Sequence, residues 1–201
     1  MSWIKTIPFE EASGTLKKLY DRVVGPNNNV DNILMVHSLR PHTLQGHMAL
    51  YKNVIHNANN MVPKSFLETL GVYVSMLNKC VYCTEHHFAG LKRLLNDDDK
   101  ASLIRKSFEE DDLQEVFDNK EHSSLKYARK LTLCPHLLSH QDVDEMRDEG
   151  WDDGEILEIN QVVSYFNYAN RTVNGLGVTT DGDILGLSPN DSDDPDNWGH
   201  S

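Results

Sequence analysis

Apolar residues recur every three or four positions along most of the chain, a spacing that predicts amphipathic helices. One clear example follows Pro63, a residue type common in the first turn of a helix, and its apolar positions are Phe66, Leu67, Leu70, Val74 and Leu77. The strict alternation of apolar and polar residues that is typical of strands is almost absent. The pattern therefore predicts an all-α fold.

Caps and helix breakers place the expected boundaries. We expect helices over residues 9–24, 31–38, 41–56, 63–77, 79–95, 101–107, 123–133, 139–150 and 152–173. The stretch 63–95 is too long for one ordinary globular helix, so a break is expected at Asn78, which would cap the second helix. Asp97 is expected to cap the helix over residues 101–107. Asp152 and Glu155 have the spacing of a capping box, and Gly175 is expected to end the last helix.

The composition changes near the end of the chain. After Thr179 the sequence is dominated by Asp, Gly, Pro, Asn and Ser, with little to bury. We therefore expect one helical domain over residues 1–180 and an acidic tail over residues 181–201. The tail would be disordered or would lie over a neighbouring subunit.

The charge balance excludes two classes of partner. Lys and Arg number 19 and Asp and Glu number 31, which gives a net charge of −12. An acidic chain without a basic run is a poor ligand for nucleic acid or an anionic membrane. The sequence also lacks a signal-peptide pattern at its start and an apolar run of the ~18–20 residues that span a bilayer. We expect a cytoplasmic protein with reduced thiols.

The segment 80–87 carries the chemistry that stands out most. Cys80, Cys83 and His87 are spaced i, i+3 and i+7, so they share one face of a helix. Two such thiols can lie close enough to form a disulfide. The positive end of the helix and the imidazole would both favour a thiolate, the reactive form of cysteine. The pattern favours a thiol redox site.

Two other interpretations of the segment compete with this one. The cysteines could be two small buried side chains, or they could belong to a zinc site in which Cys80, Cys83 and His87 supply three ligands. His86 or a remote residue would then be the fourth ligand, although no second CxxC motif is present. Outside a metal site, His86 is expected to be exposed, because it lies 100° from His87 around the helix.

The spacing of four residues resembles the pattern of a known protein family. Glu68, eleven residues, Cys80, Cys83 and His87 match the pattern of the alkylhydroperoxidase D-like family, within the carboxymuconolactone decarboxylase superfamily. The flanking segments 32–41, 165–171 and 174–178 resemble the branch of peroxidase-related enzymes, and the resemblance covers about residues 5–180. In one straight helix Glu68 would lie ~18 Å from Cys80. Only a chain reversal near Asn78 can bring the two together.

The resemblance implies a helical bundle with the CxxC motif at the start of a core helix. It implies a thiol-dependent peroxidase or thiol–disulfide oxidoreductase that reduces hydroperoxides, with Cys83 attacking the substrate and Cys80 closing the disulfide. His87 and Glu68 would relay the proton. An external dithiol would supply electrons, no metal or other cofactor would be needed, and the protein would be a homo-oligomer, often a trimer or hexamer in this family.

One residue departs from the family pattern. Efficient hydroperoxidases have a histidine directly before the second cysteine, whereas this chain has Tyr82. A phenol with a pKa near ~10 cannot replace imidazole as a base at neutral pH, although it can donate a hydrogen bond. The alternatives are a lactone decarboxylase-like enzyme, whose relatives generally lack the CxxC, and an oligomeric redox sensor or binding protein.

Asn167, Asn170 and Arg171 have helical spacing on the last long helix. They could line a pocket or a subunit contact, or they could form a buried polar network that fixes helix packing.

Overall fold

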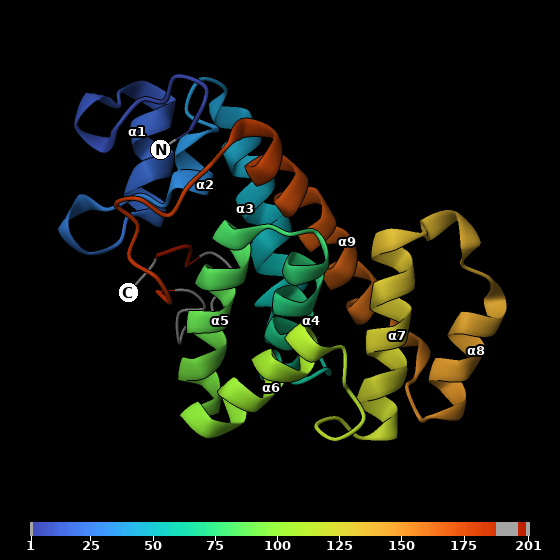
Figure 1. Cartoon of the computed structure of the whole chain (residues 1–201). Coiled ribbons are helices and arrows are strands. Elements are labelled where there is room, and N and C mark those ends of the chain that lie inside the picture. Colours follow the sequence, from blue (N-terminus) through green and yellow to red (C-terminus); the bar gives the residue numbers. More distant parts are fainter. Residues whose placement is uncertain (1, 188–196, 200–201) are drawn as a thin grey trace.

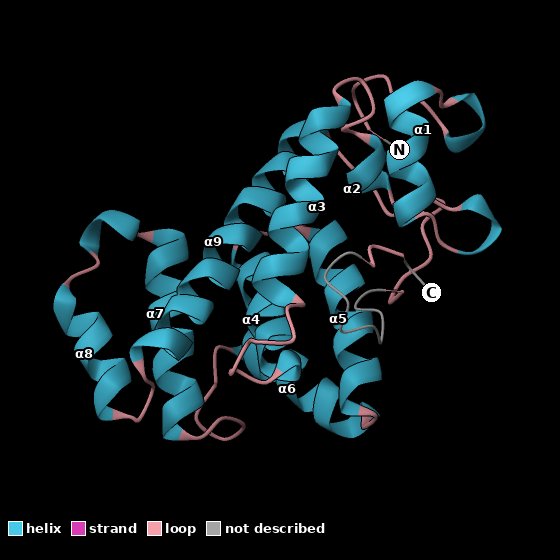
Figure 2. Ribbon diagram, turned by 180° about the vertical axis from the view of Figure 1, so that it is seen from behind, coloured by secondary structure: helices cyan, strands magenta, loops and turns pink. Residues whose placement is uncertain are grey.

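The computed structural model describes residues 2–187 and 197–199, and over these residues it contains helices and no strand (Figure 2). This confirms the predicted all-α fold. The helices are α1 (Gly14–Val23), α2 (Asn32–Met35), α3 (Pro41–Ile55), α4 (Lys64–Leu77), α5 (Val81–Leu95), α6 (Asp98–Glu110), α7 (Asn119–Leu133), α8 (His140–Asp148) and α9 (Asp153–Leu176). Three short 3-10 turns, Phe9–Glu11, Pro26–Asn28 and Pro135–Leu137, complete the set.

The centre of the molecule is a hairpin of α4 and α5, with α9 packed against it (Figure 1). Leu67, Leu70 and Val74 of α4 are fully buried in the core. Helices α4 and α9 approach closely at Gly71, where an added Cβ would lie 2.1 Å from Cζ of Phe166. Only glycine fits at this crossing, because any side chain there would displace the buried ring.

Several predicted caps are present. Asp97 accepts a hydrogen bond from the backbone N–H of Lys100, and Asp152 and Glu155 form the expected capping box of α9. The end of α9 differs from the prediction, since the helix continues to Leu176 and ends at Gly177. Gly177 has φ 61°, the left-handed conformation that glycine adopts readily at a helix C-terminus.

Several predicted helix starts need correction. Helices α6 and α7 begin at Asp98 and Asn119, earlier than the expected residues 101 and 123. The expected helix over residues 9–24 is divided, because a 3-10 turn at Phe9–Glu11 precedes α1, which begins only at Gly14. The break at Asn78 is confirmed, but Asn78 does not cap α5. It ends α4 in a helical conformation, Lys79 follows with φ 53°, and Cys80 occupies the N-cap position of α5. The CxxC motif therefore does lie at the start of a core helix.

The segment that follows α9 runs back across the face formed by α2 and α5 (Figure 1). Its Thr179 and Asp181 carbonyls accept hydrogen bonds from the side chain of Asn32, at 2.9 and 3.0 Å. Further along, the Gly186 carbonyl accepts one from Arg93 of α5 at 2.6 Å. The first residues of the predicted tail thus contact the core. The rest, apart from residues 197–199, lie outside the described residues, and the boundary at residue 180 stays a prediction.

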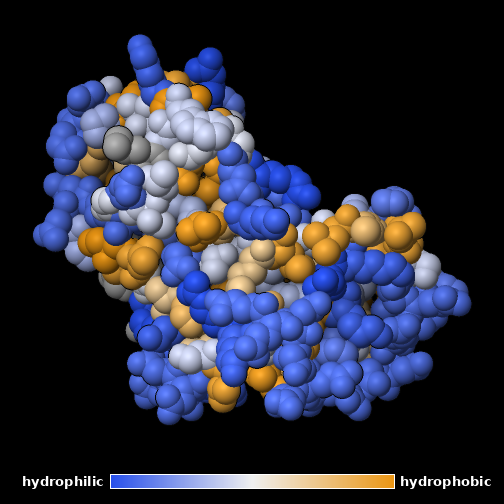
Figure 3. Space-filling view, viewed as in Figure 1, coloured by the Kyte–Doolittle hydropathy of each residue, from blue (hydrophilic) through white to orange (hydrophobic). Residues whose placement is uncertain are grey.

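Polar side chains dominate the visible surface. The face shown in Figure 3 is mainly hydrophilic, with apolar patches between the polar side chains. Among the described helices, none combines the length and the hydropathy that crossing a membrane would require.

Candidate active site

The hairpin of α4 and α5 brings together two residues that are nineteen positions apart. Glu68 of α4 has no solvent-exposed surface, and its Oε2 lies 2.7 Å from Nδ1 of His87 on α5. The chain reversal at residues 78–80 makes this contact possible. A second imidazole, that of His56 at the end of α3, lies 3.8 Å from Glu68 Oε1 through its Nε2. No sequence pattern pointed to this contact of His56, because His56 lies at the end of a separate helix.

Both cysteines of the motif are reduced and buried. Cys80 is 0% exposed and Cys83 3%. The backbone N–H of Cys80 donates to the carbonyl of Ser75 at 2.9 Å, which anchors the turn. Cys83 lies one turn into α5, and its side chain shares a hydrogen bond with that of Cys80. This proximity suits disulfide formation, which is a short-range reaction.

A cavity of about 50 Å³ opens beside the thiols. Cys83 and His87 both line it, whereas Cys80 does not. Much of the rest of its wall is aromatic, with Tyr51, Tyr165 and His47 as contributors. Since a water molecule needs roughly 10–15 Å³ measured in this way, the cavity has room for a few non-hydrogen atoms. The cavity thus places a small space beside Cys83 and His87.

The surroundings affect the two thiols differently. The hydrogen bond with Cys83 lowers the pKa of Cys80 below its ordinary value. Burial raises the pKa of Cys83 well above its ordinary value, and a hydrogen bond with Asn170 only partly opposes this rise. The thiolate expected from the sequence is thus favoured at Cys80 but not at Cys83. Cys83 needs a base to remove its proton when it reacts.

The asparagines of α9 belong to a polar network in which Asn170 is buried and Asn167 is half-buried. Arg171 is exposed, donates to Asn167 at 2.6 Å and lines a surface pocket together with Asn170, so the structure fits both predicted interpretations of these residues. Asn170 is fully buried, donates to Ser75 Oγ at 3.1 Å and accepts from Asn78 Nδ2 at 2.9 Å. Asn78 also donates to Asn167 at 3.0 Å. Because Asn170 also contacts Cys83, this network ties the position of the thiol to the turn at the start of α5.

Tyr82 contacts Asp183 and Ile33, which no pattern in the sequence connected with it. Tyr82 donates a hydrogen bond to Asp183 Oδ2 at 2.6 Å and accepts one from the backbone N–H of Ile33 at 3.1 Å. His86 Nε2 lies 3.1 Å from the same Asp183 oxygen. The prediction that His86 is exposed was wrong, since its side chain is 13% exposed. The segment after α9 covers it, and the sequence held no sign of that long-range contact.

The zinc interpretation of the motif finds no support in the geometry. Within the described part of the chain, the ligand atoms of Cys80, Cys83 and His87 are not grouped closely enough to share an ion. The group that is close enough consists of Asp31, His86 and Asp183.

Comparison with solved structures identifies the fold. No protein-family profile matches the chain, and a search of curated proteins finds no match. The structure resembles the alkylhydroperoxidase AhpD core of a peroxidase-related protein from Ralstonia eutropha JMP134, with a TM-score of 0.74 and 19% identity over 89% of this chain and 91% of the other. A peroxidase-related protein from Silicibacter sp. TM1040 gives a TM-score of 0.73 and 21% identity, again over 89% and 91%.

The debrominase Bmp8, in a cysteine-to-alanine variant bound to 2,3,4-tribromopyrrole, has the same fold with a TM-score of 0.63 and 14% identity over 82% of each chain. The chain therefore has the AhpD-like helical fold, which confirms at the level of the fold the resemblance seen in the sequence.

Proposed function

We propose that the protein is a thiol-dependent peroxidase that reduces small hydroperoxides through Cys83 and Cys80. The observation that carries the proposal is that Cys83 lines a cavity together with His87, whose imidazole is hydrogen-bonded to the buried Glu68. A nucleophile, a base and a group that orients the base are the parts required for activated thiol chemistry. The similarity to peroxidase-related proteins of the same fold supports this class of reaction.

The reaction begins at the cavity. His87 removes the proton from Cys83 as the sulfur attacks the outer oxygen of the hydroperoxide. The O–O bond breaks, the alkoxide leaves and takes up that proton as an alcohol, and Cys83 becomes a sulfenic acid. The Cys80 sulfur then attacks Cys83, water leaves, and a disulfide forms. An external dithiol returns two electrons and two protons, and both thiols are restored.

Glu68 and His87 act together in this scheme. The carboxylate accepts the hydrogen bond from Nδ1, so Nε2 is the imidazole atom that is free to take the proton. The negative charge also stabilises the imidazolium that forms. His87 lies one helical turn after Cys83, so the two side chains are neighbours on the surface of α5.

Single-cysteine variants test the roles of the two thiols. Cys83→Ser is expected to abolish turnover, whereas Cys80→Ser should leave one peroxide-dependent oxidation per chain, because the sulfenic acid has no partner. The measurements are peroxide consumption with a dithiol and mass spectrometry of the product. The reverse pattern would contradict the assignment of the attacking thiol. A single oxidation without turnover in the wild type would instead indicate a redox sensor.

A second candidate reaction is the reductive removal of halogen from a small aromatic ring. The aromatic wall of the cavity favours it, and a debrominase shares the fold. Cys83 would take the halogen from the ring carbon, which gains a proton, and Cys80 would displace halide to form the disulfide. Incubation with a bromopyrrole separates the two candidates, because bromide is released only if this reaction occurs.

The proposal extends to partners and assembly. A reducing compartment such as the cytoplasm would keep both thiols in the reduced form seen here. Val81, between the two cysteines, is 71% exposed, and Trp3 and Met61 are exposed to a similar degree. We propose a homo-oligomer with a subunit contact beside the CxxC motif, to which the exposed Val81 would contribute.

A further inference from the structure

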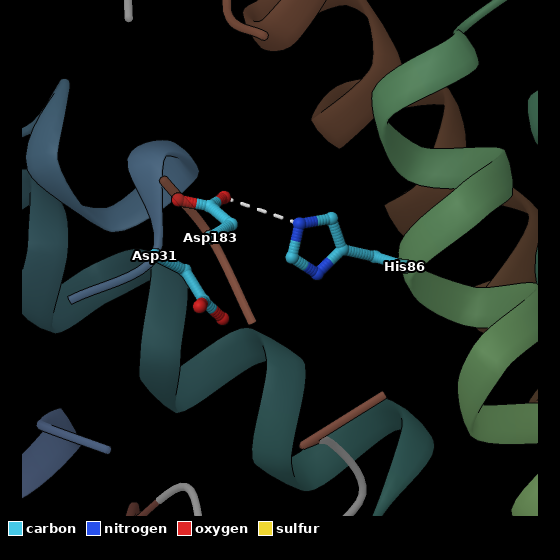
Figure 4. Close-up of side chains that lie close together, drawn as sticks. All are labelled: Asp31, His86 and Asp183. Carbon is cyan, nitrogen blue, oxygen red and sulfur yellow. Dashed lines mark hydrogen bonds and ion pairs between the residues drawn. The ribbon is translucent and has the colours of Figure 1, made fainter. Parts of the chain in front are cut away.

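Three side chains from distant parts of the sequence converge beside the thiol cavity (Figure 4). Asp31 precedes α2, His86 lies on α5, and Asp183 follows α9. One potential ligand atom from each lies within 4.8 Å of the other two, and His86 Nε2 is 3.1 Å from Asp183 Oδ2. Figure 4 shows the imidazole and both carboxylates around a shared space.

These separations suit a metal ion. Two ligands that each lie about 2.1 Å from an ion at a right angle are about 3.0 Å apart, and ligands on opposite sides are about 4.2 Å apart. The pair His86 and Asp183 already has the first separation. The Asp31 ligand atom lies within 4.8 Å of the other two, so binding of the same ion would draw this carboxylate closer to them.

The Asp183 carboxylate is held in place by its surroundings. Its side chain is only 1% exposed, both of its oxygens lie 3.1 Å from the backbone N–H of Asn32, and Tyr82 donates to Oδ2. Such outer contacts fix the orientation of metal ligands. Asp31 and His86 also line the cavity, so further coordination positions would face its interior.

The charge of the three side chains also favours a bound metal ion. With a neutral imidazole the three groups together carry two negative charges, and Asp31 is 7% exposed. A divalent cation at this point would balance the charges of the two carboxylates. Oxygen and imidazole ligands without thiolate suit Mn²⁺, Fe²⁺ or Zn²⁺.

We propose that Asp31, His86 and Asp183 bind one divalent transition-metal ion, which joins the segment after α9 to α2 and α5. The site is separate from the thiol chemistry and does not depend on the proposed peroxidase activity. The ion would neutralise the two carboxylates in this part of the cavity wall next to Tyr82.

Titration with Mn²⁺, followed by loss of the EPR signal of the free ion, tests this proposal. Mn²⁺ prefers oxygen ligands to thiolates, so the probe avoids the cysteines. We expect one bound ion per chain in the wild type and in a Cys80→Ser/Cys83→Ser variant. His86→Ala and Asp183→Asn should weaken binding at least ~10-fold. Asp181→Asn, on the same segment, is the matched control and should bind like the wild type.

Several results would overturn the proposal. They are absence of binding to the folded wild type, loss of binding in the double cysteine variant, and unchanged affinity in both ligand variants. If Asp183→Asn does not fold, as judged by circular dichroism, His86→Ala and Asp31→Asn decide the question. None of these readouts depends on peroxide turnover, so failure here is distinguishable from failure of the proposed function.

Discussion

The buried His47 makes the stability of the protein sensitive to acid. It lies on α3 in the wall of the cavity, is 4% exposed, and its Nε2 is 3.4 Å from the hydroxyl of Tyr165. Burial, together with the charge that His37 would carry nearby, lowers the pKa of His47 from 6.5 to about 3. The folded protein therefore keeps this imidazole neutral at a pH where the unfolded chain protonates it.

The sign and size of the effect follow from proton linkage. Between pH 6.5 and pH 3 the unfolded state binds more protons at His47, so the free energy of unfolding falls as the pH falls. From pH 7 to pH 5 this single group should remove about 2 kcal/mol of stability. Above pH 7 its contribution is nearly constant, because the imidazole is then neutral in both states.

Urea unfolding of wild type and His47→Gln at pH 7 and at pH 5 measures this effect. The variant is less stable at neutral pH because a packed side chain has changed, but it should lose about 2 kcal/mol less than the wild type on acidification. His42→Gln, at an exposed position of the same helix, is the control and should follow the wild type. Equal losses in wild type and His47→Gln would refute the reasoning.

Two further predictions concern the relay and the core. Glu68→Gln and His87→Ala should each slow peroxide-dependent thiol oxidation, by roughly 10²–10⁴-fold for the imidazole, and unchanged stopped-flow rates would remove them from the mechanism. Gly71→Ala should lower the free energy of unfolding by about 1–3 kcal/mol, because the new Cβ meets the ring of Phe166. Gly46→Ala, where nothing lies within 4 Å, is its control in thermal denaturation, and equal melting temperatures would contradict the predicted clash.

Local patterns in the sequence were sufficient to predict the helices and the cluster of Cys80, Cys83 and His87, whereas Glu68 was identified only through the resemblance to a known family. The period of apolar residues and the caps at Asp97 and Asp152 depend on neighbours within one turn, so they can be read directly from the chain. The contact between Glu68 and His87 needed one further inference, the chain reversal near Asn78. The structure contains that reversal, and the two side chains meet across it.

Long-range contacts account for what the sequence did not reveal. Asn78 was expected to cap α5, but its side chain instead reaches α9 and donates to Asn170. The composition after residue 179 indicated a tail, yet Asp183 lies beside Tyr82 and His86. Neither contact leaves a periodic signal, because each joins segments that are about 90 to 100 residues apart.

The central claim is that Cys83 reacts with a hydroperoxide and Cys80 then closes a disulfide. Mass spectrometry of the reduced protein after one equivalent of an organic hydroperoxide tests it most directly, with Cys134 as an internal control thiol. We predict rapid formation of a Cys80–Cys83 disulfide that a dithiol reverses, while Cys134 stays reduced. Survival of both thiols of the motif in the folded protein would contradict the account.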